Sequence, residues 1–574
     1  MRTIRRPLAA LLAAAMLLTL TGCTRANPFA RVRRTIPELA AAAEEDTAAA
    51  AVQPLCAGGY FQTPARRSVP YGSMQAAQWT QEEFEALCDA ALEAARTDSP
   101  ARFHAALMDL HGALYDMHTA YALADLYYMA DTSDEAAANA YSGALLLYNA
   151  ALDRYYDTMH TLCADGAHDA LLEKEFDAGL LDVFAGYDPA SSDGTLALLS
   201  REQDLVMQYE AEMARRSPDP DTIGEIFVSL IAVRSEMAAA AGYDSYAEYA
   251  YAADYARDYT PDEARALWTL AKERYAPLLT QYAPTGDDAA RRLAEGDLLD
   301  LSENGILSAL RTGAGMLSPE LSASCAYLID NGLYDIAASD KKAGMGFTTW
   351  LASYEAPFIF NDPYGDYYDL TSMVHEFGHF NAYYYNGSDV LFGVSDYDLS
   401  ELQSQGMEVM FLPLYDTLFG AEAGPLLRAQ TVYNLVSSVV QGAMYDEFQQ
   451  TVYQTPDLTP ARVNEIFLDI YESYGYEPYD GAEYEWMSVI HNFEQPMYYI
   501  SYAVSSLPAL ELFAMQQERP ADALDTYLRA AAMPDEWYYL SDALEALGLH
   551  DQMHAPLPSL PDTIRASGVF DISA

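Results

Sequence analysis

Basic residues are scarce in this 574-residue sequence, which holds 31 lysines and arginines against 85 acidic residues. The formal net charge at pH 7 is therefore −54. Binding to DNA or RNA requires a basic face that neutralises phosphates, so nucleic acid is not expected as a partner. The acidity suits a solubilising outer surface, and it would also favour cationic peptides.

Cysteine is scarce as well, with five residues in the chain and none of them in a C-x-x-C pair. A metal site built from cysteines is therefore not expected. Apart from Cys23, the cysteines could form one or two disulfides in an extracytoplasmic compartment, or they could remain buried free thiols. They are Cys56, Cys88, Cys163 and Cys325.

The sequence also lacks an apolar run long enough to cross a bilayer. Residues 8–20 form an apolar stretch of 13 residues, whereas a membrane-spanning helix needs roughly 20. Three arginines in the first six residues precede this stretch and Leu20-Thr21-Gly22-Cys23 ends it, which is the order of a secretory signal. The tetrapeptide resembles a bacterial lipobox, whose cysteine becomes lipidated. We therefore predict a signal peptide at 1–23, a lipid anchor on Cys23 and a location outside the cytoplasmic membrane, with an ordinary signal peptide as the alternative.

Helical periodicity organises most of the remaining chain. Ala, Leu, Glu and Met are abundant, and apolar residues recur at helical spacing from Trp79 onward. We predict a tether at 24–75, a helical N-terminal region at 76–330, a second region at 331–550 and a C-terminal tail at 551–574. Helices are expected at 81–96, 101–129, 133–163, 169–184, 199–216 and 221–242, and another is expected to begin at Thr260 and Pro261.

The character of the sequence changes near Asn331. Residues 348–361 are typical of extended structure, and Pro357 predicts an edge position because proline cannot donate a hydrogen bond to a neighbouring strand. An exposed edge strand could accept a peptide as an added strand. The alternative is a hairpin that only packs against the following helix.

The most informative motif is His375-Glu376-Phe377-Gly378-His379. Asp369 is a suitable N-cap and Asn386-Gly387 a suitable end, so the motif is predicted to lie on a helix. The two histidines then project from one face and can share a metal, while Glu376 can handle a proton. Gly378 costs about 0.8–1 kcal/mol of helix stability relative to alanine and would let another backbone or a ligand approach closely. The alternative is a surface helix with two solvated histidines.

A second acidic motif follows at residues 400–408. Ser400 and Gln403 have the form of a capping box, so a helix is predicted to begin there. Glu401 and Glu408 are seven residues apart and share a face, which makes Glu401 the candidate third metal ligand. Glu408 would hold a ligand imidazole by its other N–H. Competitors for the third ligand position are Asp396 and Asp398.

Together the two motifs resemble the thimet oligopeptidase and oligoendopeptidase F family of zinc metallopeptidases, in which a helix with E-x-x-S-Q-x-x-E supplies the glutamate ligand. Residues 486–503 are similar to the oligoendopeptidase F branch near its substrate-stabilising histidine and tyrosines. The resemblance implies that His491 and one or two of Tyr498, Tyr499 and Tyr502 donate hydrogen bonds to the developing oxyanion. The alternative for the tyrosines is core packing. Glu494-Gln495-Pro496 stands where thimet-type members carry a glycine-rich loop, so hinge flexibility is not implied here.

The resemblance implies a mainly α, large helical zincin-type peptidase with a deep substrate cleft and a small β-sheet beside the motif helix. Residues 331–550 would form the catalytic region and bind one Zn²⁺ per chain through His375, His379 and Glu401. Glu376 would activate water to hydrolyse short oligopeptides at a membrane surface. Two alternatives remain, a catalytically weak peptide-binding lipoprotein and a related zinc carboxypeptidase. The sequence gives no oligomeric state.

Overall fold

The computed structural model describes residue 64 and residues 66–572, apart from 98, 165, 177–180, 182–183, 186–191, 214, 216, 296–297, 389–395, 535–538 and 556. The predicted signal peptide, Cys23, Cys56 and residues 24–63 and 65 of the predicted tether lie outside these residues. Cys88, Cys163 and Cys325 are free thiols; Cys88 and Cys325 are buried, as the free-thiol alternative has it, whereas Cys163 is only partly buried.

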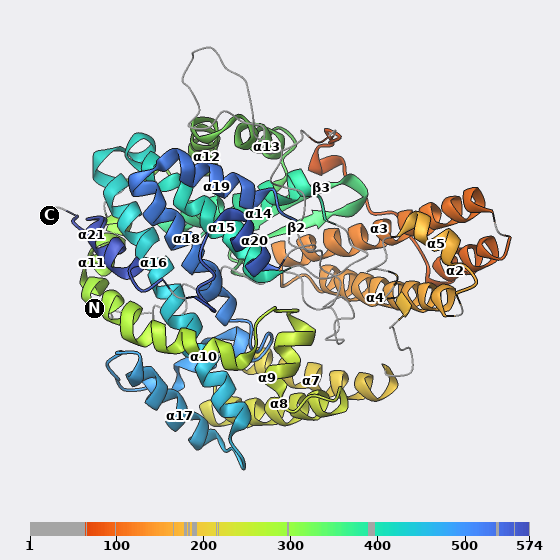
Figure 1. Cartoon of the computed structure of the whole chain (residues 1–574), viewed down its shortest axis with the longest axis horizontal. Helices are drawn as coiled ribbons and strands as arrows, with labels where there is room; N and C mark the ends of the chain where they lie inside the picture. Colours follow the sequence, from red (N-terminus) through yellow and green to blue (C-terminus); the bar gives the residue numbers. More distant parts are fainter. Residues whose placement is uncertain are drawn as a thin grey trace.

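An arm of four helices projects from one side of the molecule (Figure 1). It has a hydrophobic core of its own, which includes Phe84, Phe103, Leu107 and Tyr155. The first helix begins at a capping box between Thr80 and Glu83, because each residue's side chain satisfies a backbone N–H of the other. The helices are α2 (Gln81–Ala95), α3 (Pro100–Ala130), α4 (Glu135–Cys163) and α5 (Asp169–Glu175).

The helices of the arm and the two that follow lie close to the predicted ranges, with two differences. Helix α5 ends at Glu175, before the predicted end at 184, because Phe176 is already extended. Helix α7 (Ser192–Met213) begins seven residues before the predicted start at 199. Thr260 caps helix α10 with Glu263 as its partner, as predicted. The remaining helices before the sheet are α8 (Pro220–Ala240), α9 (Tyr246–Tyr249), α10 (Pro261–Leu270), α11 (Ala276–Glu295), α12 (Glu303–Leu317) and α13 (Pro319–Asp330), with π-helical turns at Ala250–Asp254 and Ala271–Tyr275.

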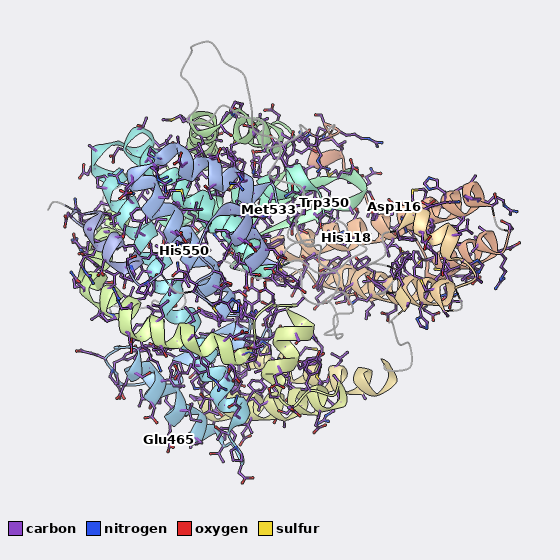
Figure 2. The ribbon with its side chains drawn as sticks, viewed as in Figure 1. Asp116, His118, Trp350, Glu465, Met533 and His550 are labelled. Atoms are coloured by element: carbon purple, nitrogen blue, oxygen red, sulfur yellow. The ribbon has the colours of Figure 1, made fainter. Side chains whose placement is uncertain are left out.

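A three-stranded sheet lies where the arm joins the body. Strands β1 (Tyr334–Asp335), β2 (Gly346–Leu351) and β3 (Ala356–Asn361) have the order β1-β3-β2, with β1 parallel and β2 antiparallel to β3. Side chains of α3 and β2 meet at this junction, where Tyr115 packs against Trp350 and Ala352 and the Ser353 hydroxyl donates to Asp116 at 2.7 Å (Figure 2, which labels Asp116 and Trp350). Strand β2 lies at an edge of the sheet but is buried at all six positions, so the alternative of an exposed edge strand does not hold for it. Strands β2 and β3 form a hairpin that packs against α14 (Tyr367–Asn386), which is the other alternative.

The predicted edge position of Pro357 is also wrong, because β3 is the central strand. Pro357 lies opposite Trp350 of β2, and β1 pairs only with Ile359 and Phe360. Because β1 runs parallel to β3 and begins only opposite Ile359, it does not extend to Pro357, so the missing N–H of the proline removes no hydrogen bond between β1 and β3.

The C-terminal half is a bundle of helices around the main hydrophobic core, to which residues from Met74 to Phe570 contribute. Helices α14, α15, α16 and α18 pack on one another there. No helix among the described residues is both long enough and apolar enough to span a membrane. The helices are α14 (Tyr367–Asn386), α15 (Tyr397–Phe411), α16 (Tyr415–Gln454), α17 (Pro460–Ser473), α18 (Ile500–Glu518), α19 (Pro520–Ala531), α20 (Leu540–Leu547) and α21 (Leu560–Ala566).

Both predicted N-caps of the motif helices are wrong by a few residues. Helix α14 is capped by Asp366, and the carboxylate of Asp369 instead accepts the backbone N–H groups of Tyr364 and Gly365. Helix α15 is capped by Asp396, which leaves Ser400 inside the helix. The predicted end of α14 is confirmed, because Gly387 follows it with a φ of 76°. The fold is thus mainly α with a small sheet beside the motif helix, as predicted.

Candidate active site

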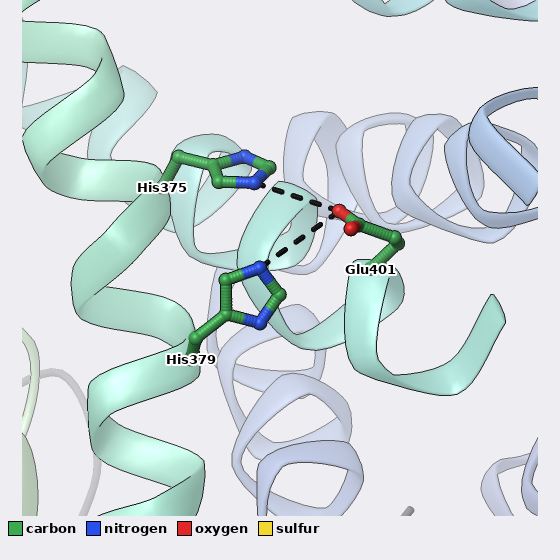
Figure 3. A group of neighbouring side chains, drawn as sticks. All are labelled: His375, His379 and Glu401. Atoms are coloured by element: carbon green, nitrogen blue, oxygen red, sulfur yellow. Dashed lines mark ion pairs between the residues drawn. The ribbon is translucent and has the colours of Figure 1, made fainter. Parts of the chain in front are cut away.

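Helices α14 and α15 bring His375, His379 and Glu401 together in a buried group (Figure 3). One ligand atom from each residue lies within 4.8 Å of the other two. Glu401 Oε2 is 3.5 Å from His375 Nε2 and 3.9 Å from His379 Nε2. Two imidazoles and one carboxylate are a donor set of catalytic zinc sites, which leave a further position for water.

The close approach of the two helices depends on Gly378. A Cβ atom at this position would lie 2.6 Å from both the Gln403 carbonyl oxygen and the Ser404 Cα atom. The close backbone approach predicted from the sequence is therefore confirmed. This close approach sets the distance between Glu401 on α15 and the two histidines on α14.

Hydrogen bonds outside the three candidate ligands orient them. The Glu408 carboxylate lies 2.8 Å from His375 Nδ1, which leaves the other ring nitrogen facing the site. The Ser400 hydroxyl lies 3.2 Å from His379 Nδ1, and Ser404 donates to Glu401 Oε2 at 3.0 Å. Sequence reasoning assigned Ser400 to a cap and missed this contact.

The two competitors for the third ligand position lie at the start of α15 and bind other partners. Asp396 accepts the N–H of Leu399 as the N-cap of α15. Asp398 accepts a hydrogen bond from Tyr259 at 2.9 Å. Within the described residues, neither belongs to the group that could hold a metal.

Glu376 lies beside the candidate ligands and is 1% exposed. Thr348 of β2 donates a hydrogen bond to its Oε2 at 2.8 Å, a contact that the sequence did not indicate. Burial raises the pKa of Glu376 to about 7, although the nearby His375 opposes this shift. A carboxyl group with this pKa can both accept and release a proton near neutral pH.

Without a bound metal, the two candidate histidine ligands differ in pKa. Burial lowers the pKa of His375, but the carboxylates of Glu401 and Glu408 outweigh it and raise the pKa well above its usual value. Burial lowers the pKa of His379 to about 4. In the part of the chain that the structure describes, His375 Nε2 is buried and has no hydrogen-bond partner. An orphaned imidazole nitrogen facing another imidazole and a carboxylate fits a divalent metal ion.

The segment from His491 to Tyr502 lies next to Glu401. The Tyr502 hydroxyl is 3.1 Å from His491 Nε2, and the Tyr498 hydroxyl donates to Glu401 Oε1 at 3.4 Å. The ring of Tyr499 stands edge-on to His491, with ring centroids 5.3 Å apart. All four residues named from the sequence therefore lie in one cluster next to the candidate ligands.

A cavity opens beside His375 with about 690 Å³ of space, part of it continuous with solvent. Helix α16 contributes Asn434, Ser438 and Gln441, which the sequence analysis missed although they recur at helical spacing in a largely apolar helix. No lysine or arginine is among the described residues that line the cavity. The remaining lining residues are Tyr368, Thr371, Ser372, His375, Gln405, Glu408, Leu435, Tyr499 and Tyr502.

No protein-family model matches this chain. No curated protein matches it in sequence either. Solved structures do resemble it. One described as an oligoendopeptidase F has 20% sequence identity and a TM-score of 0.72, over 88% of this chain and 100% of that one.

Two further solved structures are similar over comparable lengths. PZ peptidase A, solved with an inhibitor, has 19% identity and a TM-score of 0.70 over 87% of this chain and 99% of that one. A protein described as an oligoendopeptidase F from Bacillus anthracis str. Ames has 18% identity and a TM-score of 0.68 over 88% and 99%. This chain therefore has the large helical fold of these structures.

Proposed function

We propose that this chain, which has the fold of solved oligoendopeptidase F structures, is a zinc-dependent endopeptidase for short peptides. The observation that carries the proposal is the buried group of His375, His379 and Glu401, with Glu376 and the His491–Tyr502 pair around the same site. A protein that only bound peptides would have no physical need for all of these groups.

The proposed chemistry is hydrolysis by an activated water. Zinc held by His375, His379 and Glu401 would lower the pKa of a bound water to about 7 and polarise the scissile carbonyl. Glu376 accepts the proton of the attacking water and then delivers it to the leaving amine. Its hydrogen bond from Thr348 fixes the carboxylate orientation during both transfers.

Two side chains of the His/Tyr segment are assigned to the oxyanion. The Tyr502 hydroxyl and His491 Nε2 lie 3.1 Å apart next to the site, and we assign each as a donor that turns from this shared hydrogen bond toward the developing charge. Such a donor typically contributes about 3–4 kcal/mol to the transition state. Tyr498 instead donates to the carboxylate of Glu401, so we assign it to orienting that ligand.

An endopeptidase fits the cavity better than a carboxypeptidase does. Recognition of a free C-terminal carboxylate calls for a cationic side chain. The described lining residues include neutral amides, hydroxyls and tyrosines but no lysine or arginine. Peptides blocked at the C-terminus should therefore be cleaved internally, and a requirement for a free carboxylate would contradict this assignment.

The proposed location is extracytoplasmic, at a cell membrane, with a lipid on Cys23 as the anchor. This part of the proposal rests on the basic start, the apolar stretch and Leu20-Thr21-Gly22-Cys23. Replacing Cys23 with serine should release the protein from the membrane fraction, whereas retention there would contradict the anchor.

Glu376→Gln tests the proposed function most directly. The amide keeps the shape of the side chain but cannot accept the proton, so peptide hydrolysis should be lost while zinc remains bound at one equivalent. Turnover at the wild-type rate in a pure preparation would contradict the assigned base. A wild-type protein that holds zinc and returns every peptide uncut would instead favour the peptide-binding alternative.

A further inference from the structure

The segment of residues 489–499 carries His491 and Tyr498 but is mostly irregular backbone. A short 3-10 turn spans Ile490–Asn492, and helix α18 begins only at Ile500. Between this turn and α18, a stretch that the structure describes throughout, the Gln495 carbonyl accepts a backbone N–H from within the segment, that of Tyr498, whereas several other carbonyls do not. Buried side chains from elements more than two hundred residues earlier in the chain bind several of them.

Arg257 holds the C-terminal part of this segment. Its guanidinium donates to the Met497 carbonyl at 2.8 Å and to the Ser501 hydroxyl at 2.8 Å. The side chain is 2% exposed. Three tyrosine rings surround it, with centroids 4.5, 4.5 and 5.7 Å from its Cζ atom; they belong to Tyr251, Tyr255 and Tyr259.

Arg234 of helix α8 holds the N-terminal part. Its guanidinium donates to the carbonyls of Asn492 and Phe493, which directly follow His491. Glu202 accepts from Arg234 Nε at 2.6 Å and balances the buried charge. Arg234 therefore binds the backbone just after His491, whereas Arg257 binds the Met497 carbonyl and the hydroxyl of Ser501, the residue before Tyr502.

Met497, whose carbonyl Arg257 binds, has a strained conformation. Its φ is 66°, a region that side chains other than glycine rarely adopt. Its N–H donates to the side-chain oxygen of Gln449, and its carbonyl accepts from Arg257. Strained backbone persists only where the surrounding structure determines it, and here both polar groups of the strained residue are fixed.

We infer that Arg257 and Arg234 form a two-point clamp that holds the oxyanion donors His491 and Tyr502 in place before substrate arrives. The inference deepens the proposed function and rests on it. Arg257 Nε also lies 4.0 Å from Asp398 Oδ2, three residues before Glu401 on α15. The clamp thus ties the donors to the helix that supplies the carboxylate ligand. Neither arginine touches substrate, so both are positioning residues.

Arg257→Lys in the purified full-length chain is the test. Lysine keeps the positive charge but cannot span both acceptors, so the donors should drift while the metal ligands stay. A misplacement of about 1 Å costs on the order of 100-fold in rate. We expect kcat to fall by roughly 10- to 100-fold, with KM within about twofold and one zinc still bound.

Two further variants separate the clamp from general destabilisation. Ser501→Ala removes one acceptor of Arg257 with little change in volume, so it should fold and lower kcat in the same direction by a smaller factor. Arg428→Lys is the matched control, because Arg428 pairs with Asp416 on the surface side of α16. It should leave kcat, KM and zinc content unchanged.

Hydrogen exchange gives a readout that does not depend on catalysis. In the metal-free protein, amides of residues 493–502 should be protected in the wild type and exchange faster in Arg257→Lys, with other segments unchanged. A folded, zinc-loaded Arg257→Lys with wild-type kcat and wild-type exchange would overturn the clamp, as would a rise in KM alone. A wild-type protein that cleaves no peptide would contradict the proposed function. The clamp is tested separately, because fast exchange of the amides of 493–502 in the wild type would overturn it whether or not the protein cleaves peptides.

Discussion

Replacing Gly378 with alanine should loosen the candidate metal site, because the added methyl group meets the backbone of α15. The Cβ atom would lie 2.6 Å from the Gln403 carbonyl oxygen and the Ser404 Cα atom. Ordinary contact would require α14 and α15 to separate by roughly 0.5–1 Å. Ligand distances at a metal site tolerate about 0.2 Å, so Glu401 would no longer complete the group with His375 and His379.

The destabilisation by the added methyl group is offset in part by the higher helix propensity of alanine. Overpacking a core typically costs about 1–3 kcal/mol, and alanine in place of glycine returns about 0.8–1 kcal/mol of helix stability. We expect a small net loss in the free energy of unfolding, about 0–2 kcal/mol, with a much larger loss of zinc affinity. Urea unfolding and competition with a zinc chelator measure the two quantities separately.

A matched control is available on the arm. Gly143 lies inside α4 and is exposed, and a methyl group added there would meet no described atom of another turn or element within 4 Å. Gly143→Ala should therefore raise the free energy of unfolding by up to about 1 kcal/mol without affecting zinc. A Gly378→Ala protein that binds zinc as tightly as the wild type would refute the close-approach argument.

Other predictions concern the tyrosines and a buried acid. Tyr502→Phe should lower kcat by roughly 100-fold or more with zinc retained, whereas Tyr498→Phe should mainly lower the affinity for zinc. Steady-state kinetics and metal analysis measure the two effects, and the reverse pattern would contradict the assigned roles. Burial raises the pKa of Asp125 to about 7, so the folded state favours its neutral form. The free energy of unfolding should therefore fall as pH rises from about 4 to about 7 and then level off. Asp125→Asn should remove this fall and unfold at higher urea than the wild type at pH 8; equal midpoints would contradict it.

The local motifs were predictable because they depend on spacing along one helix. His375 and His379 share a face at any helical H-x-x-x-H, and Glu401 and Glu408 share one at a spacing of seven. The caps were less predictable, since several aspartates compete near each helix start. Asp369 accepts backbone N–H groups from the preceding turn, so Asp366 is left to cap α14. Asp396 in the same way caps α15 ahead of Ser400.

The contacts that join distant parts of the chain could not be predicted from local patterns. Arg257 lies 240 residues before Met497, and although the three tyrosines around it are close in sequence, nothing there indicates its contact with the Met497 carbonyl. Thr348 reaches Glu376 only because the sheet packs on α14. The edge prediction for Pro357 fails because proline alone says nothing about how far a neighbouring strand extends.

The central claim is metal-dependent cleavage of peptides, and mass spectrometry of a short-peptide library tests it most directly. The chain without residues 1–23 would be incubated with the library, with and without a zinc chelator. The account predicts internal cuts that vanish with chelator and return when Zn²⁺ is added. Intact peptides beside protein that contains one equivalent of zinc would contradict it.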